Sequence, residues 1–441
     1  MIALWGGVEC SVVRVGNRFV DEVELTGHGA RLDDLDRIAA LGIRTVRYPV
    51  VWERVWPVPH QAPDWRFTDE RLGRLRELGI RPIVGLVHHG SGPRHTDLLS
   101  DSFATGLAVF ARMVAERYPW IEDYTPVNEP LTTARFSGLY GHWYPHHRDH
   151  ASFVRALVVE CLGVRAAMKA IRLVQPAARL VQTEDIGTVF ATDTLAHQAE
   201  FENQRRFLSL DLLSGRVDDD HPLRRHLGGV EAMLASLVDE PCPPDVIGVN
   251  HYVTSDRFLD ERLERYPAHT HGGNGRQAYA DVEAVRVLGA GIAGFRGALD
   301  AVWSRYRRPI AITEAHLGAS PDEQIRWLVE AWSHARAAAE AGADIRAVTV
   351  WSLFGATDWD SLLTQARGRY EPGVFDIRGG EVRPTPLARV AADLALRGRT
   401  EHPFASTPGW WRQPERLLYP VVDAARSRRP QPCGSVPSPA W

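Results

Sequence analysis

The chain has 441 residues, 44% of them hydrophobic, and a formal net charge of -4 at pH 7. This charge gives no reason to expect nucleic acid or an anionic membrane as a partner, and no stretch has the length and apolarity of a membrane span. The first residues lack the basic segment of a signal peptide, so a cytoplasmic protein is expected. The cysteines form no CxxC pair, and Lys169 is the only lysine, which argues against a zinc knuckle and a Schiff-base enzyme.

Short apolar segments alternate with longer segments of helical periodicity along the chain. Strands are predicted over residues 2–5, 45–48, 82–87, 123–127, 180–183, 246–249, 310–313 and 348–351. Helices are predicted over residues 33–41, 69–78, 102–118, 151–174, 198–213, 294–305, 322–341 and 387–397. Several strands are apolar throughout, which is typical of parallel strands covered on both faces. The pattern predicts an α/β fold with a single (β/α)8 TIM barrel over residues 1–400 and a short C-terminal extension over 401–441.

The C-terminal extension has a weaker pattern. Trp410 and Trp411 are expected to pack against the barrel, and a short helix is expected over 414–425. Residues 430–441 are rich in proline and serine, which is typical of a disordered tail or a linker. No dinucleotide-binding fingerprint is present, so the chain itself is not expected to be a reductase.

Polar and aromatic residues follow the predicted strands, where a barrel of this kind carries its reacting groups. In strand order they are Glu9, Arg47, His88-His89, Asn128-Glu129, Glu184-Asp185, Asn250 with Tyr252, Glu314, and Trp351 through Trp359. Side chains of these types bind or react with sugars, water or carbonyl groups. Their convergence on one end of the strands favours a catalytic barrel mouth.

Two glutamates stand out among these residues. Glu129 follows a strand within Asn128-Glu129-Pro130, whose proline ends the strand and stiffens its exit, and Glu314 follows a strand in the same way. Closure of the barrel would bring both to one mouth. A retaining glycosidase needs such a pair, about 5–5.5 Å apart, with one carboxylate to attack the anomeric carbon and one acid to protonate the leaving oxygen. Glu184 and Asp185 share one strand end, cannot straddle a bond, and are expected in the cleft wall.

Several segments resemble, in order, glycoside hydrolase family 1, the β-glucosidase family. They are residues 47–57, 125–130, 246–252, 312–314, 351–359 and 369–376. The resemblance implies a retaining O-glycosidase acting on small β-glycosides or oligosaccharides, with Glu129 as acid/base and Glu314 as nucleophile. Because the two groups act differently, the proton is expected on Glu129. No cofactor and no metal are expected.

Further residues of these segments are expected to bind the substrate or support the pair. Arg47 would hold Glu314 ionised, and Tyr252 would donate its hydroxyl to the same carboxylate. Asn128 would hold the 2-hydroxyl of the sugar. The remaining predicted contacts are His88, Asn250, Asp358 and the flat rings of Trp351 and Trp359. The alternatives are a salt bridge inside the barrel for Arg47 and core packing for the tryptophans.

Other positions depart from the family's pattern. Val13 and Arg14 occupy the region of a sugar-contacting glutamine, and His89 stands where the family usually has tryptophan. Asp358 replaces a longer glutamate, and Ala315-His316 replace Asn-Gly after the nucleophile. The acid pair is retained, so the reaction type is better supported than the sugar. A modified or deoxygenated sugar is one hypothesis.

Alternative functions stay open. An acceptor hydroxyl could replace water, which would make the enzyme a transglycosidase, or the barrel could be catalytically silent and bind sugars or a partner. Barrels resembling this one occur fused ahead of deoxysugar reductase domains, so a fused or associated deoxysugar-pathway enzyme is a candidate partner. Two histidine-rich segments, residues 88–95 and 141–150, lack the spacing of a zinc hydrolase site and are expected to line the outer cleft.

Overall fold

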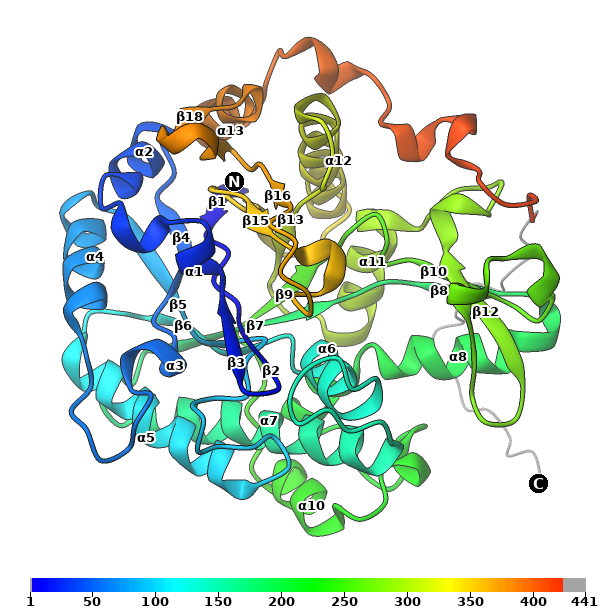
Figure 1. Cartoon of the computed structure of the whole chain (residues 1–441), viewed down its shortest axis with the longest axis horizontal. Helices are drawn as coiled ribbons and strands as arrows, with labels where there is room; N and C mark the ends of the chain where they lie inside the picture. The colour runs from blue at the N-terminus through cyan, green and yellow to red at the C-terminus, as the bar shows by residue number, and fades with distance from the viewer. Residues whose placement is uncertain (1, 423–441) are drawn as a thin grey trace.

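The computed structural model describes residues 2–422 and shows a closed barrel of parallel strands surrounded by helices (Figure 1). The strands are β1 (Ala3–Gly7), β4 (Thr45–Pro49), β5 (Arg81–His88), β6 (Asp123–Asn128), β7 (Arg179–Asp185), β9 (Val246–Asn250), β13 (Ile310–Ala315) and β14 (Ile345–Val350). Around the barrel their order is β1-β14-β13-β9-β7-β6-β5-β4. The predicted (β/α)8 fold is therefore confirmed.

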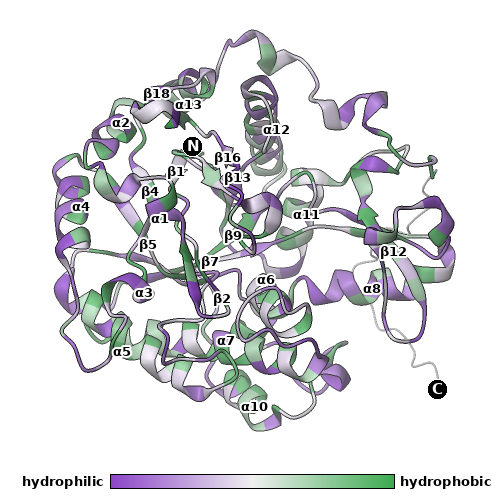
Figure 2. Ribbon diagram, viewed as in Figure 1, coloured by the Kyte–Doolittle hydropathy of each residue, from purple (hydrophilic) through white to green (hydrophobic). Residues whose placement is uncertain are grey.

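The helices that follow these strands cover the outside of the barrel. They are α2 (Asp34–Ala40), α4 (Arg66–Glu77), α5 (Asp101–Arg117), α7 (His150–Arg172), α8 (Ala196–Arg205), α9 (Leu208–Leu213), α11 (Gly294–Tyr306), α12 (Pro321–Glu340) and α13 (Pro386–Arg397). Gly42 and Gly79 follow α2 and α4 with φ of 81° and 66°, a left-handed conformation that lets the chain leave a helix and enter the next strand. Figure 2 shows hydrophilic residues along outer helices such as α8.

The predicted helix over 198–213 is wrong as a single element, because it breaks between α8 and α9. All the residues of α9 are buried, and α9 packs against α7 and α10 (Glu231–Asp239). At the break, Arg206 donates to the carbonyl of Gly187 at 2.6 Å. The turn places a helix that is buried on every side inside the molecule, which one straight amphipathic helix could not do.

The sequence did not indicate two small sheets at the barrel's rim. A hairpin of β2 (Val12–Val15) and β3 (Arg18–Asp21) follows β1. A four-stranded sheet, in the order β11-β12-β10-β8, lies beside the barrel at the right of Figure 1. Its strands are β8 (Val189–Ala191), β10 (Arg257–Asp260), β11 (His271–Gly273) and β12 (Ala278–Glu283). Both sheets are built from loops that follow strands, so they lie at the end of the barrel that carries the polar residues.

The segment after α13 packs along the outside of the barrel, as predicted for Trp410 and Trp411. The Trp411 ring is buried, lies 4.9 Å from the ring of Trp327, and donates from Nε1 to Glu330 at 2.8 Å. The predicted helix over 414–425 is wrong for the described residues. They form a 3-10 turn (Pro414–Arg416) and then an extended segment, in which Val422 pairs with Leu288 in a parallel β-bridge. Pro420 has no backbone N–H to donate within a helix. Residues 423–441, with the predicted tail, lie outside the described part.

Within residues 2–422, no helix combines the length and the apolarity needed to cross a membrane. The separation of the chain at residue 400 into a barrel and an extension stays a prediction.

Candidate active site

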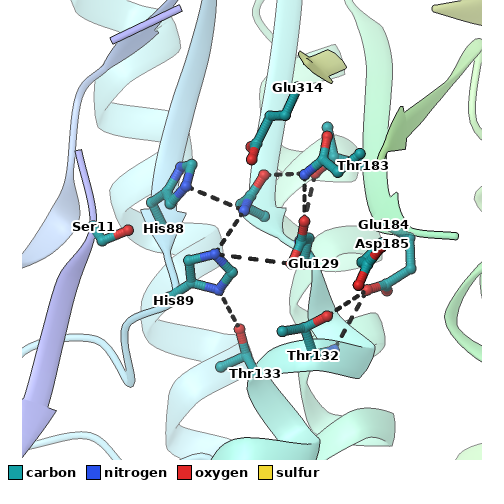
Figure 3. Close-up of polar contacts among 12 residues, drawn as sticks. Ser11, His88, His89, Glu129, Thr132, Thr133, Thr183, Glu184, Asp185 and Glu314 are labelled. Atoms are coloured by element: carbon teal, nitrogen blue, oxygen red, sulfur yellow. Dashed lines mark hydrogen bonds and ion pairs between the residues drawn. The ribbon is translucent and has the colours of Figure 1, made fainter. Parts of the chain in front are cut away.

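The predicted site residues converge at the carboxyl ends of the barrel strands. In the strand pairing, Asn250 stands beside Glu314, and His88 stands beside Asn128. Arg47 stands on β4 beside Gly7 of β1. Figure 3 shows the carboxyl groups of Glu129 and Glu314 with His88 and His89 around the same space. Barrel closure thus brings together residues from distant parts of the chain.

A chain of hydrogen bonds links the two glutamates on one side through Arg47. Its Nη1 donates to Glu314 Oε1 at 2.7 Å and to the carbonyl of Thr313 at 2.9 Å. Its Nη2 donates to Asn128 Oδ1 at 2.7 Å. Asn128 directly precedes Glu129, so one guanidinium group fixes the nucleophile candidate and the backbone that carries the acid candidate.

A second chain of contacts closes the ring through Asn250. Its Nδ2 donates to Glu129 Oε1, and its Oδ1 accepts from the hydroxyl of Thr313 at 2.7 Å. Thr313 directly precedes Glu314. Both carboxyl groups therefore belong to one buried polar network.

Glu314 has two partners that favour its ionised form. Burial raises its pKa, but the charge of Arg47 and the hydroxyl of Tyr252, which donates to Oε2, both oppose that effect. Each oxygen thus accepts one strong hydrogen bond from a fixed donor. A positive charge and a hydroxyl at contact distance favour the charged form of the carboxyl group.

Glu129 has the opposite surroundings. Burial raises its pKa well above the usual range, and the negative charges of Glu314, Asp185 and Glu184 raise it further. The amide of Asn250 opposes these effects only in part. The nearest basic group, Nε2 of His89, lies 3.9 Å from Oε2. Of the two carboxyl groups, Glu129 is the one that holds a proton more strongly.

Two histidines at the end of β5 line the site as neutral rings. Burial lowers the pKa of His88 well below its usual range and lowers the pKa of His89 to about 3. The amide nitrogen of Asn128 lies 3.2 Å from Nε2 of His88 and 3.3 Å from Nε2 of His89. Neutral imidazoles add hydrogen-bonding atoms without adding a charge beside Glu129.

The predicted aromatic residues have different positions. Trp351 is buried, stacks on His88 at 5.6 Å and lies under the guanidinium of Arg47, which is 4.7 Å from its ring centre. Trp359 is half-buried, and its Nε1 has no hydrogen-bond partner among the described residues. Trp351 therefore supports the base of the site, while the Nε1 of Trp359 is a buried donor without a partner among the described residues.

Asp358 directs its carboxylate at the backbone of its own loop. The side chain accepts from the backbone N–H groups of Arg367, Gly368 and Arg369 at 2.9, 3.1 and 2.7 Å. The geometry gives this residue a role in holding the loop. Its contact with a sugar stays a prediction.

Sequence reasoning missed the apolar rim of the site. Val13, Trp143 and Leu363 form a buried cluster with the half-buried Phe136 and Trp359, and His89 packs against it at 5.3 Å from Trp143. Leu363 reaches the cluster from a left-handed backbone with φ of 58°. These residues come from four separate loops, so no local pattern could have grouped them. Among residues 2–422, no three His, Cys, Asp or Glu side chains are arranged to hold a metal ion.

The chain is similar to curated β-glucosidases at low sequence identity. No family model matches the chain. A bifunctional β-D-glucosidase/β-D-fucosidase of Bifidobacterium breve is 25% identical over 376 residues, which are 74% of this chain and 78% of the relative. β-Glucosidase 4 of Oryza sativa subsp. japonica is 21% identical over 398 residues, with 79% of this chain and 80% of the relative covered.

Solved structures show the same barrel. The family 1 β-glucosidase of Thermotoga maritima superposes with a TM-score of 0.68 at 17% identity, over 84% of this chain and 86% of that chain. The same enzyme in complex with cyclophellitol superposes with a TM-score of 0.69 at 17% identity, over 89% and 97% of the two chains. The chain is therefore similar in sequence to β-glucosidases and has the (β/α)8 barrel of a β-glucosidase.

Proposed function

We propose that the protein is a retaining β-glycoside hydrolase of the glycoside hydrolase family 1 type. The observation that carries the proposal is the unequal setting of two buried glutamates within one network. Glu314 contacts a guanidinium and a phenol, whereas Glu129 is surrounded by negative charges and an amide. Such an inequality divides two like groups into a nucleophile and an acid. The sequence relatives are named as β-glucosidases, which supports the same reaction class.

In the first step, an oxygen of ionised Glu314 attacks the anomeric carbon while Glu129 gives its proton to the leaving oxygen. The bond from the sugar to the leaving group breaks, and an ester bond to Glu314 forms. In the second step, Glu129, now ionised, takes a proton from water, whose oxygen attacks the same carbon and releases Glu314. Retention requires the two carboxyl groups about 5–5.5 Å apart.

Asn128 is oriented for a contact with the 2-hydroxyl. Its Oδ1 accepts from Arg47 at 2.7 Å and from the Thr183 hydroxyl at 2.8 Å, so its NH2 group points toward His88 and His89 and would exchange one of those contacts for the 2-hydroxyl. A hydrogen bond to the 2-hydroxyl strengthens as charge develops on the ring. His88 and the half-buried ring of Trp359 would contact other parts of a small β-glycoside, and Asn250 would aim Glu129.

The experiment that tests the proposal follows an aryl β-glucoside by NMR during its hydrolysis. The β-anomer of the sugar is expected as the first product. First release of the α-anomer would overturn the role of Glu314 as nucleophile. Absence of turnover on a panel of aryl β-glycosides would instead support a silent, sugar-binding barrel. Products formed with an added alcohol distinguish hydrolysis from transglycosylation, because only a transglycosidase would give mainly the alkyl glycoside.

A further inference from the structure

Glu184, at the end of β7, contacts the segment that carries the acid candidate. Helix α6 (Pro130–Ala134) begins directly after Glu129, and its first residue has no backbone N–H. The next two backbone N–H groups, of Leu131 and Thr132, both donate to the carboxylate of Glu184, at 2.9 and 3.4 Å. Figure 3 shows Glu184 beside Thr132 on this side of the site. The start of the helix is thus held from a neighbouring strand.

Glu129 itself has a backbone conformation that needs support. Its φ of 46° and ψ of 66° lie in the left-handed region, which is unfavourable for a residue with a side chain. Two residues at the end of β7 hold the backbone of Glu129 and the helix that follows it. Thr183 accepts from the backbone N–H of Glu129 at 3.4 Å, and Glu184, the next residue, holds the helix that follows. If either contact were lost, the backbone could relax and turn the carboxyl group of Glu129 away.

Glu184 is also fully buried and close enough to act on Glu129 by its charge. Burial raises the pKa of Glu184 to about 7, an effect opposed by the hydroxyl of Ser209, which donates to Oε2 at 2.6 Å, and by the two backbone amides. The ionised form of Glu184 is one of the charges that favour the protonated form of Glu129. Together with Glu314 and Asp185, Glu184 is among the strongest charges that act on Glu129.

We propose that Glu184 is a positioning residue for the acid/base step, which anchors the start of α6 and keeps the Glu129 carboxyl group aimed into the site. Its negative charge also helps to keep the proton on Glu129 between turnovers. This inference rests on the proposed glycosidase function.

The test compares Glu184→Gln with Asp256→Asn. Asp256 is a matched control, because it too is buried and accepts from backbone amides, those of Thr188 at 2.6 Å and Gly294 at 2.8 Å. Its charge is not among the strongest of those that act on Glu129. For each variant, kcat and KM are measured across pH on aryl β-glucosides with good and poor leaving groups.

Glu184→Gln is expected to lower kcat/KM about 10- to 100-fold for poor leaving groups and far less for good ones, because only the former need full protonation. The basic limb of its pH profile is expected to move to lower pH, since a charge that favours protonated Glu129 is gone. Asp256→Asn should leave both readouts as in the wild type. An equal loss for all leaving groups, with an unmoved basic limb, would overturn the inference and leave Glu184 a purely structural residue.

Ser209→Ala covers the case in which Glu184→Gln does not fold. Loss of the hydroxyl donor favours neutral Glu184, so the basic limb should again move to lower pH, by a smaller amount. An unmoved limb in Ser209→Ala would count against the inference by itself. If the wild type hydrolyses no glycoside, the proposed function fails; if the wild type is active and Glu184→Gln matches Asp256→Asn, only this inference fails.

Discussion

The surroundings of Glu129 and Glu314 differ although the side chains are the same and are equally buried, at 3% and 2% exposure. β13 delivers Glu314 to Arg47 and Tyr252, which bring a charge and a hydroxyl. β6 places Glu129 beside the amide of Asn250 and near the carboxylates of Glu184 and Asp185 at the end of β7. Burial alone raises the pKa of both groups, so burial cannot separate their roles. The neighbours supplied by adjacent strands separate them.

The largest expected effect comes from removing the nucleophile candidate. Glu314→Ala should lower kcat on the order of 10⁴-fold or more, because it removes the carboxylate proposed to attack the anomeric carbon. Azide, which is small enough to occupy the vacated space, should restore turnover of a substrate with a good leaving group and yield the α-glycosyl azide. A β-glycosyl azide would show that Glu314 is not the nucleophile and would contradict the different roles assigned to Glu129 and Glu314.

Removing the acid should give a selective loss. Glu129→Gln is expected to cut hydrolysis about 10²-fold or more for poor leaving groups and much less for good ones, because only poor leaving groups need a proton. The wild-type activity should also fall at high pH, as Glu129 loses its proton, with a limb above the usual range of a glutamate. The rates of the wild type and of Glu129→Gln across a series of leaving groups measure the selective loss. A uniform loss would reject Glu129 as the acid.

The role of the hydrogen-bond donors to Glu314 can be tested by the acidic limb of the pH profile of kcat/KM. Tyr252→Phe removes a hydroxyl that lowers the pKa of Glu314, so the pH at which Glu314 ionises should rise and the acidic limb of kcat/KM should move to higher pH. An activity loss of about 10-fold is expected, the size of one strong hydrogen bond. Tyr124→Phe is the control, because the Tyr124 hydroxyl is buried without a partner among the described residues. An equal shift in both variants would contradict the assignment.

A third glutamate shows what burial does without a catalytic partner. Burial raises the pKa of Glu53 to about 8, and its Oε1 accepts from the backbone N–H of Gly92 at 2.9 Å. The folded chain therefore keeps a proton that the unfolded chain releases near pH 4.5, and Glu53 stabilises the fold less as the pH rises from 4.5 to 8.

In Glu53→Gln, the free energy of unfolding should fall less between pH 5 and pH 8 than in the wild type, by up to about 1.4 kcal/mol per pH unit. Denaturant titrations at the two pH values give this difference. Parallel pH curves for the two proteins would show that Glu53 does not titrate in this range.

Local signals in the sequence determined the eight strands, the barrel, and the choice of Glu129, Glu314 and Arg47. Apolar runs, helical periodicity and polar strand ends are properties of short segments, so they can be recognised without knowing how the rest of the chain packs. The contact of Arg47 with Glu314 joins residues 267 positions apart, yet the barrel made it predictable, because strands of known order end at a common mouth.

Only the tertiary structure decided which neighbour each side chain meets. Four features have no local signature in the sequence. They are the break between α8 and α9, the contacts of Asp358 with its own loop, the apolar cluster of Val13, Trp143 and Leu363, and the hydrogen bonds from the start of α6 to Glu184. Each depends on how loops from different strands pack and on which buried polar group must find a partner. Free energy is minimised over the whole packed mouth, so these details follow from the assembled fold and not from any one segment.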